Sequence, residues 1–164
     1  MLNCDEVDLK IVNLLMEDGR MPAAEIARKV GSGISERVVR YRIERLIREK
    51  VISLTAVVNP RSLGYSIVAD VWLECKSDSI LDVAEKLSKY AMVSYVACAI
   101  GETDVSVQII AKDTAEVYNF VTGVIGKISG VRKTTTSIVP IVLKDVHQWR
   151  IPAEVIGDST SSRN

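Results

Sequence analysis

A twelve-residue stretch, VRYRIERLIREK at residues 39–50, concentrates positive charge in a chain of 164 residues whose formal net charge is zero. Residues 20–50 as a whole carry nine basic side chains against four acidic ones. Two other segments carry a net negative charge. Residues 1–18 have one basic and five acidic side chains, and residues 66–145 have eight basic and ten acidic side chains. Guanidinium groups gathered on one surface bind phosphates and base edges, so the segment predicts a surface for a polyanion such as double-stranded DNA.

These charges also admit a simpler interpretation, in which the arginines pair with acidic neighbours on a solvated helix face. Glu36, Glu44 and Glu49 lie within reach of several arginines along a helix. Composition leaves both interpretations open until the residues are placed on a helix.

The residues from Ser35 onward have the pattern of an amphipathic helix, with Ser35 as its N-cap and Glu36 in its first turn. At about 100° per residue, the apolar and polar side chains fall on opposite sides of this helix. The apolar side, expected to face a core, consists of Val39, Ile43, Leu46 and Ile47. The polar side consists of Arg37, Tyr41, Glu44, Arg45 and Arg48.

Two further helices are predicted before this one. Asp5 can cap a helix whose apolar residues recur at helical spacing from residue 7 to residue 15, and Gly19 suits a left-handed C-terminal cap. Pro22 stands near the first turn of a second helix, which ends in a glycine-rich turn. Three helices joined by short turns predict a tri-helical, winged-type helix-turn-helix domain over residues 1–52.

In a helix-turn-helix, the N-terminal part of the second helix of the motif enters the major groove of DNA. This placement separates the side chains that can read bases from those that can only reach the backbone. The residues predicted to contact base edges are Ser35, Glu36, Arg37, Arg40 and Tyr41. Arg45 and Arg48 lie further along and are predicted to contact phosphates, which would add affinity and salt dependence but little sequence preference.

Residues 53–64 are expected to link this domain to a second one. The β-branched run from Val51 to Val58 predicts a strand, and Asn59 with Pro60 predicts a turn. Gly64 predicts a break before the next strand.

Residues 65–145 alternate strand and helix patterns in the order β-α-β-β-α-β. The strand patterns span 66–75, 93–100, 105–111 and 131–143, and the helix patterns span 80–90 and 114–128, the latter with Thr114 as its cap. This order predicts a ferredoxin-like effector and assembly domain, so the whole chain belongs to the α+β class. The helices would cover one face of the sheet, and we expect an apolar stripe between subunits, formed by Val71, Leu73, Val105, Val107 and Ile109.

From residue 5 to about residue 145, the chain resembles the family of the leucine-responsive regulatory protein and AsnC (Lrp/AsnC) transcription regulators. The resemblance rests on the order and spacing of DEVDLKIVNLLMEDGR, AEIARKVG, RIERLIREKVI, VVNPRSLGYSIV, AIGETDVSVQI and ISGVRKTTTSIV. It implies a sequence-specific DNA-binding regulator of transcription and homodimers that assemble into higher oligomers such as octamers. It also implies a small effector, commonly an amino acid, bound between dimers. We expect no cofactor.

The resemblance implies a particular effector site, in which the loop GETD faces a polar segment of the last strand. Its residues are Gly101, Glu102, Thr103, Asp104, Thr134 and Thr136. Glycine lets a ligand approach backbone amides that can hold a carboxylate, and an aspartate can receive an ammonium group. A structural interpretation stays open, because Gly and Asp also form ordinary hairpin loops.

Two other classes of protein remain as alternatives. The two-domain arrangement also resembles siroheme decarboxylases, which carry a His-containing cluster on the strand that corresponds to residues 93–100. That segment holds no His, and the single histidine of the chain, His147, lies in the C-terminal extension at residues 146–164. We therefore expect no enzyme activity. A metabolite-sensing protein with an unused DNA module is the other alternative, and the arginine-rich helix argues against it.

Composition narrows the cellular setting. Cys4, Cys75 and Cys98 are odd in number and far apart, which indicates neither a disulfide framework nor a metal site. No apolar run approaches a membrane span, and the acidic N-terminus is unlike a secretory signal, so we expect a cytoplasmic protein without a membrane partner. The polar residues 146–164 are expected to be partly disordered, with room for a short docking segment at Trp149, Ile151 and Val155.

Overall fold

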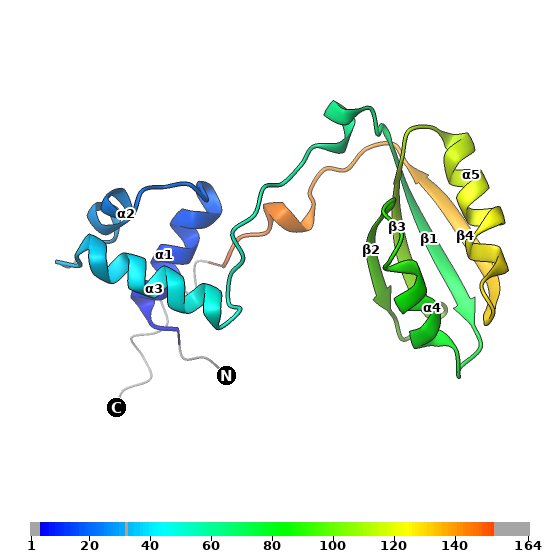
Figure 1. Cartoon of the computed structure of the whole chain (residues 1–164), viewed down its shortest axis with the longest axis horizontal. Coiled ribbons are helices and arrows are strands. Elements are labelled where there is room, and N and C mark those ends of the chain that lie inside the picture. The colour runs from blue at the N-terminus through cyan, green and yellow to red at the C-terminus, as the bar shows by residue number, and fades with distance from the viewer. Residues whose placement is uncertain (1–3, 32, 153–164) are drawn as a thin grey trace. The chain divides into compact units, whose positions relative to one another are not determined.

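The computed structural model describes residues 4–31 and 33–152, and the chain divides into two compact units. The first unit holds the described residues up to Val57 and from Lys144 onward, and the second unit holds residues 58–143 (Figure 1). No helix in the described ranges has the length and apolar character needed to cross a membrane.

Helix α1, Glu6–Glu17, begins where the sequence predicts. The carboxylate of Asp5 accepts a hydrogen bond from the Asp8 amide at 2.8 Å, and the Asp8 carboxylate accepts one from the Asp5 amide at 3.1 Å, which forms a capping box. The predicted left-handed cap at Gly19 is wrong. Asp18 ends the helix by adopting an extended conformation, and its carboxylate accepts a hydrogen bond from the Arg20 amide at 2.8 Å, so the chain turns without a left-handed residue.

Helices α2, Ala23–Val30, and α3, Glu36–Arg48, complete the helical part of the first unit. Helix α2 follows Pro22 directly, and Ser35 caps α3 by accepting a hydrogen bond from the Val38 amide at 3.3 Å. The core of the unit is made by Ile11, Leu15, Met21, Ile26, Val30 and Val39.

The predicted apolar side of α3 is partly wrong. Val39 and Leu46 are fully buried and Ile43 is half-buried, but Ile47 is 41% exposed. The side of α3 that faces α1 also carries Arg42 and Arg45, both of which pair with Asp8, so the contact with α1 is partly polar rather than wholly apolar.

The second unit contains strand β1, Ile67–Cys75; helix α4, Ile80–Leu87; and strands β2, Val93–Cys98, and β3, Val105–Ala111. Helix α5, Thr114–Gly123, and strand β4, Val131–Val139, follow. The strands form one antiparallel sheet in the order β2-β3-β1-β4, which confirms the predicted β-α-β-β-α-β arrangement. One detail differs: the cap of α5 is Asp113 rather than Thr114, because the Asp113 carboxylate accepts a hydrogen bond from the Glu116 amide at 2.8 Å.

The apolar stripe that was expected between subunits lies instead in the core of the single chain. Its five residues, Val71, Leu73, Val105, Val107 and Ile109, are at most 2% exposed and pack with buried residues of α4 and α5. Alternation along a strand therefore places Asp70, Trp72, Ser106 and Gln108 on the opposite face, which we call the open face of the sheet.

The strand predicted from Val51 to Val58 is absent from the structure. These residues pair with no strand in the described chain, and Val57 and Val58 are largely exposed. β-branched residues favour a strand only where a neighbouring strand can accept their hydrogen bonds. Asn59 then caps a short 3-10 helix at Pro60–Leu63, and Gly64 ends it in the left-handed conformation with φ of 85°. In the C-terminal extension, a 3-10 turn lies at Val146–Gln148, and residues 153–164, including Val155, lie outside the described residues.

Candidate nucleic-acid interface and effector loop

The arginines of α3 are mostly paired with acidic side chains. Arg40 pairs with Glu36, Arg42 with Asp5 and Asp8, Arg45 with Asp8, and Arg48 with Glu49 at 3.8 Å. Arg37 is the one arginine of the helix without an acidic partner among the residues that the structure describes. The excess positive charge of this segment is thus largely balanced within the unit.

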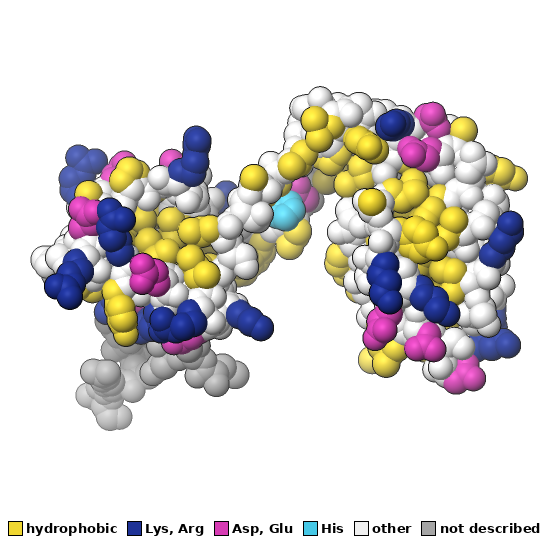
Figure 2. Space-filling model, viewed as in Figure 1, with side chains coloured by type: hydrophobic (Ala, Val, Ile, Leu, Met, Phe, Trp, Pro, Cys, Tyr) yellow, Lys and Arg dark blue, Asp and Glu magenta, His cyan; other side chains and the backbone are white. Residues whose placement is uncertain are grey.

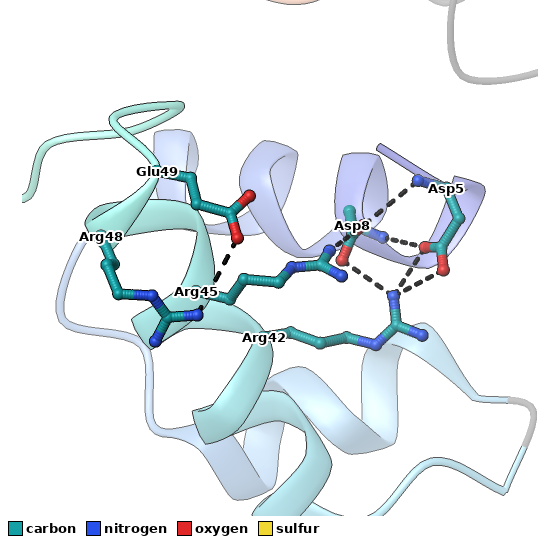
Figure 3. A network of polar contacts seen from close by, with 6 residues as sticks. All are labelled: Asp5, Asp8, Arg42, Arg45, Arg48 and Glu49. Atoms are coloured by element: carbon teal, nitrogen blue, oxygen red, sulfur yellow. Dashed lines mark hydrogen bonds and ion pairs between the residues drawn. The ribbon is translucent and has the colours of Figure 1, made fainter. Parts of the chain in front are cut away.

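Two of these arginines form a partly buried cluster with α1, which we call the α1–α3 clamp (Figure 3). Asp8 is only 1% exposed, and its carboxylate accepts hydrogen bonds from Arg42 at 2.8 Å and from Arg45. Arg42 also donates to both carboxylate oxygens of Asp5 at 2.7 Å. A buried carboxylate that accepts from two guanidinium groups is well satisfied, so the clamp fixes α3 against α1.

The clamp changes the acid–base properties of its members. Partial burial, the largest single effect, raises the pKa of Asp5, but the hydrogen bond from Arg42, the backbone hydrogen bonds from Asp8 and Val7 and the charge of Arg42 together outweigh it and hold that pKa below its ordinary value. The same hydrogen bond raises the pKa of Arg42. Both groups therefore remain charged over a wider pH range than in an unfolded chain.

The clamp also corrects the expected position of Arg45. The helical wheel places Arg45 on the solvent side with Arg37 and Arg48, whereas its side chain is 25% exposed and turned toward Asp8. The bond to Asp8 occupies Nη2 of Arg45 and turns the side chain toward α1, so Arg45 is less available to a phosphate than the exposed Arg48, and its phosphate contact stays a prediction. Sequence reasoning did not include Arg42, although Asp8, an acid on the apolar stripe of α1, was a signal that a buried basic partner existed.

The other predicted DNA contacts lie together on the exposed side of α3. Ser35, Glu36, Arg37, Arg40, Tyr41 and Arg48 are all exposed. Val38, which the sequence did not single out, is 41% exposed and lies beside Arg37 near the start of the helix. Figure 2 shows basic side chains, with acidic ones between them, around this unit. The arrangement offers hydrogen-bond donors, acceptors and an apolar contact on one helix face.

The loop with the sequence GETD connects β2 to β3, and its aspartate has a structural role. One carboxylate oxygen of Asp104 accepts a hydrogen bond from the Cys75 amide at 2.7 Å, and the Asp104 amide donates to the Leu73 carbonyl at 2.8 Å. Gly101 has φ of 152°, a value that favours glycine, and Glu102 beside it is exposed. Asp104 therefore fixes the loop to the end of β1 through two hydrogen bonds, a structural role that does not depend on a ligand.

The single chain does not bring the predicted threonines against this loop. Thr134 of β4 pairs with Leu73 on one side of β1, and the Asp104 amide bonds the Leu73 carbonyl on the other side. Two strand spacings of about 5 Å each therefore separate Thr134 from Asp104. Thr136 pairs with Val71 and lies still further from the loop. Thr103 is half-buried within the loop. The loop residues and Thr134 thus lie toward one end of the sheet and Thr136 lies near the middle of β4, so the described chain does not bring the six predicted effector residues together.

Sequence reasoning also missed an ion pair at this end of the sheet. Lys133 of β4 donates to Glu74 of β1 at 2.8 Å, and this hydrogen bond raises the pKa of Lys133. Ile100, directly before the loop, is fully exposed. On the open face, a hollow of about 220 Å³ is lined by Asp70, Trp72, Tyr95, Ser106, Val107 and Gln108, in a different place from the loop.

A helix-turn-helix unit joined to an α+β sandwich defines a two-domain regulator of transcription, in which one domain binds DNA and the other a ligand. Residues 5–47 match the AsnC-type helix-turn-helix domain, and residues 68–148 match the Lrp/AsnC ligand binding domain. The chain belongs to the Lrp/AsnC family of transcriptional regulators.

Relatives agree with this assignment. The chain is 39% identical over 142 residues to the HTH-type transcriptional regulator FL11 of Pyrococcus furiosus, covering 86% of this chain and 92% of the relative. It is 38% identical over 141 residues to an uncharacterized HTH-type transcriptional regulator of Pyrococcus abyssi, covering 85% and 88%. Escherichia coli AsnC has the same fold, with a TM-score of 0.79, 21% identity, and coverage of 89% of this chain and 99% of AsnC.

A Neisseria meningitidis transcriptional regulator in complex with L-Met is similar in fold as well. Its TM-score is 0.80 at 24% identity, over 87% of this chain and 94% of that structure.

Proposed function

We propose that this regulator binds specific DNA sequences as an oligomer in the cytoplasm and that a small metabolite of the amino-acid class, bound between subunits, modulates it. The observation that carries the DNA part is the exposed first half of α3. Ser35 caps the helix there, and Arg37 has no acidic partner among the described residues. This is the part of a helix-turn-helix that faces base edges.

The effector part is supported by the end of the sheet that carries the GETD loop. The exposed Glu102 and the carboxylate oxygen of Asp104 that does not bond the Cys75 amide can accept hydrogen bonds from an ammonium group. Lys133 can meet the carboxylate of a ligand if it exchanges its present partner, Glu74. The loop and Thr134 lie apart within one chain, so a second subunit is needed to enclose a ligand. The relative crystallised with L-Met supports an amino acid as the first candidate.

Two features support an oligomer. The open face presents Trp72 and Tyr95 around a hollow, and an aromatic surface of this kind is stabilised by burial against another subunit. After Ile52, whose amide bonds the Leu46 carbonyl, residues 53–58 expose apolar side chains and make no backbone hydrogen bond among the described residues, so a second copy of the chain could add a strand there.

DNA footprinting on the upstream region of the protein's own gene tests the proposal. Performed at two salt concentrations, with and without a pool of amino acids, it should show protection at intervals of about one helical turn that weakens with salt and changes with the pool. Absence of protection at both salt concentrations would overturn the DNA part of the proposal.

The effector part has a separate test. Isothermal titration with single amino acids identifies the ligand, and Asp104→Asn should bind it at least about tenfold more weakly, because a carboxylate makes stronger hydrogen bonds to an ammonium group than an amide does. Equal affinity of both proteins, or no heat with any amino acid, would remove the loop as the effector site.

A further inference from the structure

One ion pair on α3 lies where base recognition is expected. Glu36 is the first residue of the helix and Arg40 follows one turn later, and one carboxylate oxygen of Glu36 accepts from both Nε of Arg40, at 3.0 Å, and Nη2. The side chains are 45% and 65% exposed. The pair thus stands on the outer surface of the first two helical turns.

The pair leaves one acceptor and one donor group unused. Both hydrogen bonds end on Oε1 of Glu36, so Oε2 has no partner among the described residues, and the same is true of Nη1 of Arg40. The unused oxygen and nitrogen can therefore meet a third group while the pair stays intact. A side-chain unit of this kind presents an acceptor next to a donor.

Stability accounts for only part of this pair, through the favourable position of Glu36 at the N-terminus of α3 and a weak pairing one turn apart. Exposed ion pairs contribute little to folding because solvent screens them. A carboxylate on a surface that approaches phosphates also weakens DNA binding unless it finds a donor on a base. Glu36 is therefore costly on this face except where it has a base to recognise.

The bases that fit are cytosine and guanine. In the major groove, the N4 amino group of cytosine is a donor that carboxylates accept from, and O6 and N7 of guanine are acceptors that arginine donates to. A C·G base pair presents this donor beside these acceptors. We infer that Glu36 and Arg40 act together to select a C·G base pair in each half-site, an inference that rests on the proposed function and specifies its DNA ligand.

Selection of bound duplexes from a random DNA pool by the full chain tests this assignment. The wild-type protein should enrich a C·G pair at one position of each half-site. Glu36→Gln should lose or shift this preference by about tenfold, because an amide also donates and prefers adenine. Arg40→Gln should lose the preference for guanine at the same position.

Glu44→Gln is the matched control, since Glu44 is also exposed on α3 and loses the same charge but lies two turns further along. It should bind more tightly to all sequences without changing the selected base. A Glu36→Gln protein that selects the same C·G pair as the wild type overturns the inference while DNA binding stands. If neither the wild type nor the variants enrich any duplex, the proposed function fails with it.

Replacement of that guanine by 7-deazaguanine supplies an independent readout. Loss of N7 should weaken binding of the wild-type protein by several-fold and leave Arg40→Gln unaffected. Equal weakening of both proteins would assign the guanine contact to another residue and overturn the role of Arg40.

Discussion

Replacing Asp8 by asparagine should destabilise the helical unit strongly, because it removes the charge that holds the α1–α3 clamp together. Removing one partner of a fully buried ion pair costs about 3–5 kcal/mol. Arg42 and Arg45 are 22% and 25% exposed, so water compensates for part of the loss and we expect roughly 2–3 kcal/mol. For a small domain, this corresponds to a fall in melting temperature of roughly 10–20 °C.

Thermal unfolding followed by far-ultraviolet circular dichroism measures this effect on the α-helices. Glu44→Gln serves as the control, because Glu44 is exposed and has no ion pair among the described residues. Its melting temperature should stay within about 2 °C of the wild type. If Asp8→Asn unfolds within the same range, the clamp does not stabilise the unit and the reasoning is refuted.

The same clamp predicts how DNA binding depends on salt. Arg45 is held by Asp8, so Arg45→Gln should leave the slope of log affinity against log salt unchanged, whereas Arg48→Gln should reduce its magnitude by about 0.9 if Arg48 meets one phosphate. Gel-shift titrations at four salt concentrations measure both slopes. Equal reductions for the two variants would show that Arg45 leaves Asp8 when DNA binds.

Three further predictions concern caps, turns and pH. Gly130→Ala should lower the unfolding free energy by roughly 3 kcal/mol, because Gly130 has φ of 100° and an added Cβ would collide with Cβ of Ser79. Urea denaturation measures this change, and a loss below about 0.5 kcal/mol would contradict the prediction. Ser35→Ala should cost about 1 kcal/mol by removing the cap of α3, whereas Ser35→Asp should not. The lowered pKa of Asp5 means that its stabilisation is complete above its unfolded value near pH 4 and is lost as pH falls through the folded value. Unfolding free energy measured from pH 6 to pH 2 should therefore fall less steeply in Arg42→Gln, and parallel curves would exclude the Asp5–Arg42 pair as the cause.

Local signals predicted much of this structure. The caps at Asp5 and Ser35 and the strand order of the second unit depend on short-range hydrogen bonds and on periodicity, which a sequence displays directly. The strand expected at Val51–Val58 failed because pairing depends on a partner that the sequence of one segment does not contain. Periodicity also could not tell which face of the sheet the helices cover.

In the candidate sites too, features that depend on nearby residues could be predicted, and features that depend on distant residues could not. Exposure of Arg37 and Tyr41 follows from their position on one helix. The orientation of Arg45 depends on Asp8, which lies 37 residues earlier in the chain, and the structural bond of Asp104 depends on the Cys75 amide, 29 residues earlier. Spacing within a motif carries no information about such partners.

The internal pairing of the arginines in α3 also affects how a regulator searches a genome. Every stretch of chromosomal DNA competes with the operator through its phosphates, and free arginines would bind all of these stretches alike. Carboxylates of the protein already occupy four of the five arginines of the helix, so random DNA must compete with them for the same groups. If α3 binds an operator as proposed, its occupancy should therefore depend less on the charge of the helix than on the ratio of its affinity for the correct bases to its affinity for other sequences.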